Sequence, residues 1–250
     1  MALSSVLQTE FSVVYCGLRI SEVILDKYRQ LIMKLLLTST GLTQKKIREF
    51  FVSQFDTLKD KKACLIFTVR TEDDWKWLDL YDEELKDIGL AYDVVNISEE
   101  KDLSDLPAYD IYYVCGGNAF YILDRFRKTH LDKRLLEEIE NGKFYIGVSA
   151  GSIVVGPNIQ TAVVSGEAGD ENDIHLEDLS GFHLVPFCMA PHFVERLGGK
   201  IERLQKEIGK PIAAITDEQA VFVTDQGQQL IGDSGGLFLE CHFDEAANSY

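Results

Sequence analysis

From residue 33 onward, apolar runs of strand length alternate with segments of helical length. Residues 62–68 and 111–115 form two such runs, whereas residues 45–58 and 74–89 carry apolar side chains at helical spacing. Strands that are apolar throughout are typical of a sheet buried on both faces, and helices that connect parallel strands provide that cover. The sequence therefore predicts an α/β fold with a mostly parallel central sheet.

The same pattern continues along the chain and indicates one domain. A first strand is expected to begin at Met33, and residues 156–181 are polar and acidic. Two more helices and several later strands follow from the same spacing. The helices are expected at 119–128 and 131–141, the strands at 92–96, 144–146, 182–187, 213–215 and 220–223, and a terminal hairpin at 228–231 and 236–239.

The first 32 residues differ from the rest. They lack the basic start and the continuous apolar core of a signal peptide, and Glu10 interrupts them early. We therefore expect residues 1–32 to be an N-terminal extension and residues 33–250 to be the functional domain. The alternative, in which residues 1–32 are an integral first element of that domain, stays open.

Charge and cysteine content disfavour several classes of protein. The chain has 25 Lys and Arg against 41 Asp and Glu, a net charge of −16, which disfavours binding to nucleic acid. No apolar run approaches the roughly 18 residues of a membrane span. The five cysteines include no C-x-x-C pair, which indicates reduced thiols rather than disulfides or a zinc site. We expect a cytoplasmic protein with no metal, no cofactor and no nucleic-acid or membrane partner.

Residues 144–153 contain a G-x-S-x-G motif, Gly147-Val148-Ser149-Ala150-Gly151. An apolar strand precedes the motif, and an apolar run suited to a helix follows it. A serine on a tight strand-to-helix turn needs small neighbours because adjacent elements approach closely there. Its hydroxyl is then exposed at the carboxyl end of a sheet and the N-terminus of a helix. Ser149 is therefore the candidate nucleophile.

A second motif, Gly116-Gly117-Asn118, follows the strand at 111–115 and precedes a helix. Its amides are therefore expected at the same sheet edge as Ser149. Glycine permits an unusual backbone conformation that points an amide at a developing oxyanion. A simple tight turn is the alternative interpretation of this motif.

A candidate base follows the apolar stretch at 185–190. Of the five histidines, His192 alone comes directly after an expected buried strand. A base in that position can reach a nucleophile at the sheet edge. His192 is therefore the candidate general base, against the alternative of a structural or solvated histidine.

Taken together, these motifs resemble peptidase E, the α-aspartyl dipeptidases, within a group that also includes cyanophycinases. The resemblance is densest over residues 113–157 and extends over roughly residues 33–232. The matching motifs are the turn and following aromatic at 116–120, the elbow at 147–152, Gly156-Pro157, Pro191-His192-Phe193 and residues 215–220.

The resemblance implies a flavodoxin-like three-layer α/β sandwich of the class I glutamine amidotransferase type. In that wider group the elbow residue is usually cysteine, so serine here favours the serine peptidases. Residue by residue, the resemblance implies Ser149 as nucleophile, His192 as general base, Asp217 as the histidine-orienting carboxylate, and the amides of Gly117 and Ala150 as oxyanion donors. We also expect Gly116 and Asn118 to contact substrate.

Two assignments leave alternatives open. Glu218, Glu167 and Asp170 compete with Asp217 for the role of third triad member. Selectivity for aspartate needs a cation, which in the family falls near residues 196–203, where the local match is poor. Arg203 is the candidate there, with Lys200 as a second choice, and a solvated helix face is the alternative for each.

The leading hypothesis is a serine peptidase that hydrolyses short peptides, among them dipeptides with N-terminal aspartate, through an acyl-enzyme. The chain order Ser, His, acid differs from the order Ser, acid, His of α/β-hydrolases. The alternatives are a non-catalytic amidotransferase-like binding module and a cyanophycinase-like hydrolase of β-aspartyl peptides. A small peptide is the expected partner, and exposed sheet edges allow a homodimer.

Overall fold

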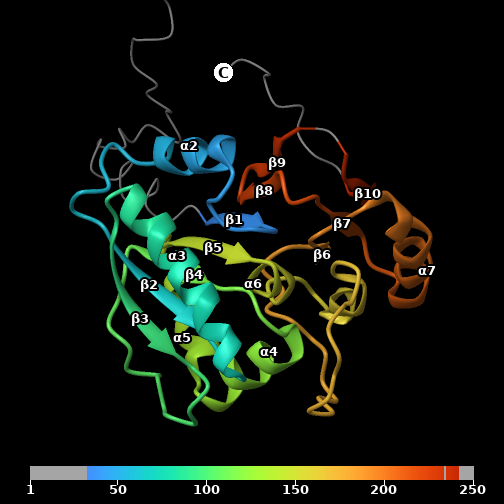
Figure 1. Ribbon diagram of the computed structural model, residues 1–250, viewed down its shortest axis with the longest axis horizontal. Helices are drawn as coiled ribbons and strands as arrows, with labels where there is room; N and C mark the ends of the chain where they lie inside the picture. The colour runs from blue at the N-terminus through green and yellow to red at the C-terminus, as the bar shows by residue number, and fades with distance from the viewer. Residues whose placement is uncertain (1–32, 234, 242–250) are drawn as a thin grey trace, which may run out of the picture.

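The computed structural model describes residues 33–233 and 235–241, so the expected extension at residues 1–32 lies outside it. Its main sheet has seven strands in the order β3-β2-β4-β5-β1-β8-β9 (Figure 1). The parallel part of this sheet comprises β3 (Ala91–Asn96), β2 (Lys62–Phe67), β4 (Ile111–Val114), β5 (Phe144–Val148) and β1 (Lys34–Thr38). The antiparallel strands β8 (Gln219–Thr224) and β9 (Gly227–Gly232) complete it. The predicted α/β fold with a mostly parallel sheet is confirmed.

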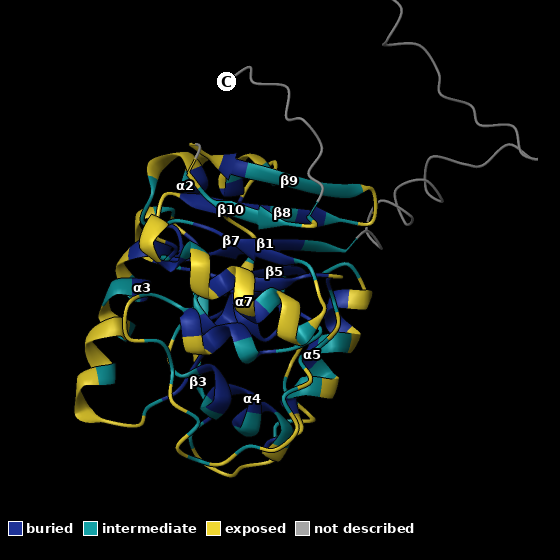
Figure 2. Ribbon diagram, turned by 90° about the vertical axis from the view of Figure 1, so that its right-hand side faces the viewer, coloured by how far each residue is buried: buried dark blue, intermediate teal, exposed yellow. Residues whose placement is uncertain are grey.

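Helices cover both faces of the main sheet and make three layers. In β1, Leu36 packs with α2 and α3 on one face, whereas Leu35 and Leu37 belong to the core under α4, α5 and α6 on the other. Both cores are buried, as the dark strands of Figure 2 show. This burial explains why the strands are apolar throughout. The helices are α2 (Lys45–Ser53), α3 (Trp75–Asp87), α4 (Ala119–Lys128), α5 (Leu131–Glu140) and α6 (Ala150–Ile153).

A second, three-stranded sheet lies beside the first in the order β10-β7-β6. Its strands are β6 (Cys188–Ala190), β7 (Ile212–Ala214) and β10 (Leu237–Leu239), with β6 and β7 parallel. The helix α7 (Gly198–Ile208) packs on this sheet through Ile201 and Leu204. Because β6 and β7 are parallel neighbours, the residues that follow each of them emerge side by side.

Two predictions about the strands are wrong. Residues 182–187 are not a strand: Phe182 and Leu184 donate backbone hydrogen bonds to Val154 and Val155, beyond α6, and β6 begins only at Cys188. The terminal hairpin does not form either, since β9 pairs with β8 and β10 pairs with β7 in the other sheet. The chain turns away at Gly232, where φ is +101° and a Cβ would lie 2.1 Å from the Glu218 carbonyl oxygen. An apolar pattern gives no sign of which partner a strand will take.

Within residues 33–233 and 235–241, no helix has both the length and the apolar character that a membrane crossing requires. In the same ranges, no cluster of three or more His, Cys, Asp or Glu side chains is arranged to hold a metal ion. The cysteines of this part of the chain, Cys64, Cys115, Cys188 and Cys241, are free thiols.

Candidate active site

The elbow between β5 and α6 holds Ser149 in a strained conformation, with φ +50° and ψ −108°. Such angles are rare outside glycine and cost of order 1–3 kcal/mol. Close packing explains the flanking glycines. A Cβ on Gly147 would lie 2.7 Å from the Gly151 carbonyl oxygen, and one on Gly151 would lie 2.3 Å from that of Val114. The motif therefore fixes the serine at the carboxyl end of the sheet.

A buried hydroxyl network ties this elbow to the neighbouring strand β1. The Thr38 amide donates to Ser152 Oγ at 2.9 Å, and the Ser152 hydroxyl lies 2.8 Å from the carbonyl oxygens of both Thr38 and Gly147. Ser152 is fully buried. It therefore stabilises the elbow and is not accessible to a substrate.

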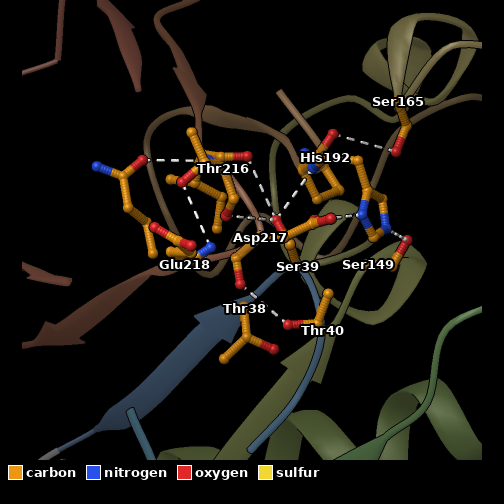
Figure 3. A network of polar contacts seen from close by, with 12 residues as sticks. Thr38, Ser39, Thr40, Ser149, Ser165, His192, Thr216, Asp217 and Glu218 are labelled. Atoms are coloured by element: carbon orange, nitrogen blue, oxygen red, sulfur yellow. Dashed lines mark hydrogen bonds and ion pairs between the residues drawn. The ribbon is translucent and has the colours of Figure 1, made fainter. Parts of the chain in front are cut away.

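Ser149, His192 and Asp217 form a hydrogen-bonded chain (Figure 3). The distance from Ser149 Oγ to His192 Nε2 is 2.9 Å, and that from His192 Nδ1 to Asp217 Oδ1 is 2.6 Å. Because an ionised carboxylate can only accept, Nδ1 carries the proton of the neutral ring, and Nε2 is left to accept from the serine hydroxyl. This is the geometry in which an imidazole can remove the proton of a nucleophile.

The second sheet places His192 and Asp217 next to each other, because His192 follows β6 and Asp217 follows β7. The end of β1 then holds both loops. The His192 amide donates to Ser39 Oγ at 3.0 Å, and the Ser39 hydroxyl lies 3.0 Å from the Thr216 carbonyl oxygen. The Thr40 hydroxyl donates to the Asp217 carbonyl oxygen at 3.1 Å. The nucleophile and its partners thus come from two sheets joined by β1.

The competing carboxylates have other partners. Asp170 accepts the Ala119 amide at 2.8 Å, at the start of α4. Burial raises the pKa of Asp170, and the Ala119 amide opposes that rise. Glu167 forms an ion pair with Arg196. Among the carboxylates weighed from the sequence, Asp217 is the one that the structure shows hydrogen-bonded to His192.

The turn at the end of β4 provides a candidate oxyanion donor. Gly117 has φ +140°, which glycine adopts readily. The Gly116 amide donates to Tyr81 Oη at 3.2 Å, and the Asn118 side chain accepts the Tyr121 amide at 2.9 Å and so caps α4. These contacts fix the turn on both sides of Gly117 at the same sheet edge as Ser149. The amide of Ala150, the first residue of α6, is the second candidate donor.

A cavity of about 560 Å³ opens over this edge. Gly116, Gly117 and Asn118 line it together with the three residues of the hydrogen-bonded chain. Arg203 does not, so the cavity adds no support for its expected role in substrate binding. Its helix α7 buries Ile201 and Leu204, which leaves Arg203 on the exposed face, where its Nε donates to the Gly199 carbonyl oxygen. The remaining lining residues are Ser39, Thr40, Thr43, Gln44, Phe67, Thr68, Arg70, Asp74, Trp77, Leu80, Tyr81 and Val148.

Sequence reasoning missed several residues of this site. Ser39, Thr40 and Arg70 each follow a strand of the main sheet, β1 or β2, at the carboxyl edge. Polar residues directly after an apolar strand are a usable signal, since ligands bind at that edge in α/β sheets. Tyr81 lies inside α3 and gives no such signal.

Comparison with known proteins places the chain in a family. The model of peptidase family S51 matches residues 35–231. An uncharacterized peptidase of Listeria innocua is 30% identical over 189 residues, which make up 73% of this chain and 90% of that protein. Peptidase E of a Nostoc species is 32% identical over 108 residues, 43% of this chain and 42% of that protein.

A solved structure agrees with these matches. The crystal structure of a Listeria monocytogenes protein assigned to peptidase E superposes with a TM-score of 0.68 at 27% identity, and the match covers 81% of this chain and 100% of the other. It shares the α/β sandwich of the class I glutamine amidotransferase type. The elbow, the fold and the extent of the family match lead to one conclusion: the chain belongs to peptidase family S51 and is a serine peptidase of the peptidase E type.

Proposed function

We propose that the protein hydrolyses short peptides, in particular dipeptides with N-terminal aspartate, with Ser149 as the nucleophile. The observation that carries this proposal is the 2.9 Å contact between Ser149 Oγ and His192 Nε2, made from an elbow where Ser149 has a φ of +50°. The cavity of about 560 Å³ is suited in size to a small ligand. Relatives named peptidase E support the peptide as substrate.

In the proposed reaction, Ser149 Oγ attacks the scissile carbonyl carbon and its proton passes to His192 Nε2. The amides of Gly117 and Ala150 donate to the resulting oxyanion. His192 then donates the proton to the departing amine, and the acyl-enzyme forms. Water, deprotonated by His192, hydrolyses the ester and regenerates the serine. Asp217 holds the ring in the required tautomer and stabilises its cation.

The experiment is hydrolysis of Asp-Leu by the wild type and two variants. Ser149→Ala removes the nucleophile, and we expect it to lower kcat by about 10⁶-fold. Asp217→Asn leaves His192 in the wrong tautomer, and we expect it to lower kcat by about 10⁴-fold. Ser165→Ala is the matched control, because the Ser165 hydroxyl only approaches the Pro191 carbonyl oxygen at 3.4 Å. We expect it to stay within about threefold of wild type.

A fluorophosphonate provides a second readout, since it labels an activated serine without requiring the right peptide. Wild-type protein should be labelled, and the Ser149→Ala and His192→Ala variants should not. A folded wild-type protein that resists labelling would refute the assignment of Ser149. Faster hydrolysis of β-aspartyl than of α-aspartyl peptides would move the substrate to the cyanophycinase-like class.

A further inference from the structure

Arg70 lies in the cavity on the side away from His192. It follows β2, and the strand order β2-β4-β5 means that the cavity extends from Arg70 past the Gly117 turn to Ser149. Among the residues that line the cavity, Arg70 is the only Arg or Lys. In a chain of net charge −16, a single Arg among the residues that line the cavity marks the place where an anionic group of a ligand is attracted.

The structure fixes Arg70 in place at both ends. Its backbone amide donates to Asp74 Oδ2 at 2.6 Å, which holds the loop after β2. Its guanidinium carbon lies 5.2 Å from the centroid of the Tyr121 ring. A guanidinium that stacks on an aromatic ring keeps the donors on its edge free to form hydrogen bonds. Arg70 is therefore held ready for a planar anion.

A carboxylate of the chain itself already occupies this edge. Asp173 forms an ion pair with Arg70 through Nη2. The same segment, residues 170–173, is attached to the Gly116-Gly117-Asn118 turn and the start of α4. Asp170 accepts the Ala119 amide, and the Asn118 side chain donates to the Glu171 carbonyl oxygen at 2.9 Å.

The Arg70–Asp173 pair is weak enough to be exchanged. The side chains of Arg70 and Asp173 are 32% and 46% exposed, respectively. Exposed ion pairs of this kind stabilise the paired state by less than about fivefold in its equilibrium constant. A ligand carboxylate that reaches the same guanidinium can therefore replace Asp173.

On the basis of the function proposed above, we propose that Arg70 is the receptor for a carboxylate of the substrate, and that Asp173 fills this receptor in the free enzyme. A guanidinium binds a carboxylate through two parallel N–H···O bonds, a geometry that an amide of the same shape cannot match. A short peptide offers two such groups, the side chain of an acidic residue and the C-terminus. Both have the chemistry that Arg70 recognises.

Calorimetry on the Ser149→Ala protein tests this without turnover. The ligands are four peptides: Asp-Leu, Asn-Leu, and the C-terminal amides of both. Loss of the Arg70 contact should weaken binding by about 10- to 100-fold, as for other hydrogen bonds to charged groups. In the Arg70→Gln background, we expect this loss only for peptides that carry the recognised carboxylate.

The four peptides distinguish the two sources. A loss that disappears when Asp is replaced by Asn identifies the side-chain carboxylate, and a loss that disappears on C-terminal amidation identifies the C-terminus. Arg203→Gln is the matched control, because Arg203 is exposed on α7 outside the cavity. If Arg70→Gln weakened the binding of all four peptides equally, or weakened the binding of none, the proposal would be overturned. It would also be overturned if the Ser149→Ala protein bound none of the four peptides.

Asp173→Asn provides the opposite test. Removal of the resident carboxylate should tighten binding of the recognised peptide by about two- to fivefold when Arg70 is present and have no effect on it in the Arg70→Gln background. Weaker binding in Asp173→Asn would overturn the competition. Fluorophosphonate labelling of the wild type tests the proposed function separately, so labelling can fail while Arg70-dependent binding persists, and the reverse can also occur.

Discussion

Ser39 is the residue through which β1 positions the candidate base, and Ser39→Ala tests that role. Ser39 is 1% exposed, and its hydroxyl accepts the His192 amide at 3.0 Å. Its other partners, the carbonyl oxygens of Ile215 and Thr216, also accept backbone amides, at 2.9 and 3.2 Å respectively, and so stay satisfied in the variant. The substitution therefore leaves one donor, the His192 amide, without its acceptor.

The magnitude follows from that single loss. An unsatisfied buried donor costs about 1–3 kcal/mol, so we expect the free energy of unfolding to fall by about 2 kcal/mol, or roughly 4–8 °C in Tm for a domain of this size. Displacement of the His192 imidazole should have a larger effect, on the rate of catalysis. A displacement of about 1 Å between reacting groups lowers a rate by about 10²-fold. We therefore expect kcat to fall by about that factor while KM changes little.

The assay measures three quantities on one preparation: urea unfolding, kcat and KM on Asp-Leu, and the rate of fluorophosphonate labelling. A purely structural role would lower stability and leave kcat and the labelling rate of the folded fraction unchanged. Ser165→Ala, with its single 3.4 Å contact to the adjacent Pro191, is the control for a serine lost near the same loop. A kcat for Ser39→Ala within about threefold of wild type would refute the positioning argument.

Two further carboxylates carry predictions. Burial raises the pKa of Glu84 to about 7 from 4.5, against hydrogen bonds from Tyr113 and Leu42 that lower it. Between these two pKa values the native chain keeps a proton that the unfolded chain has lost. This contribution to the free energy of unfolding is fully present below pH 4.5, and about 3 kcal/mol of it is lost as pH rises through 7. Glu84→Gln should remove this pH dependence, as measured by urea unfolding between about pH 5 and about pH 8. Asp170→Ala removes the acceptor of the Ala119 amide and should lower the free energy of unfolding by about 1 kcal/mol, with a fall in kcat of about tenfold as the adjacent Gly116-Gly117-Asn118 turn loosens. A fall near 10⁴-fold would instead place Asp170 in the proton transfer itself.

Much of this architecture was predictable because strands buried on both faces leave a simple mark on the sequence. β4 and all of β2 except its exposed first residue, Lys62, are buried and carry no charge, and the elbow at Ser149 carries glycines that close packing demands. The sequence singles out His192 for a similar reason, since it follows the apolar stretch at 185–190, which contains the buried strand β6.

The parts that were not predictable depend on contacts between distant segments. The sequence places Ser39 after a strand, but its three hydrogen bonds reach the backbone of His192, Ile215 and Thr216, which lie 153 to 177 positions away along the chain. These residues follow the strands of a second sheet whose existence the pattern did not show. The terminal hairpin failed for the same reason, because β10 joins β7 rather than its sequence neighbour β9. The family pattern predicts Arg203 near the substrate, whereas the packing of α7 through Ile201 and Leu204 places Arg203 on the exposed face of the helix.

The second sheet also accounts for the order of the residues along the chain. In this fold Ser149 follows β5, and His192 and Asp217 follow the parallel strands β6 and β7, which come later in the chain in that order. A histidine that precedes its carboxylate is thus a consequence of where the second sheet joins the first. Arg70, from β2, lies at the far end of the same cavity, beyond the Gly117 turn. If Arg70 binds the substrate as proposed, the peptide is held from one end of the cavity while proton transfer takes place at the other, so substitutions at Arg70 should change selectivity between peptides more than the reactivity of Ser149 toward a fluorophosphonate.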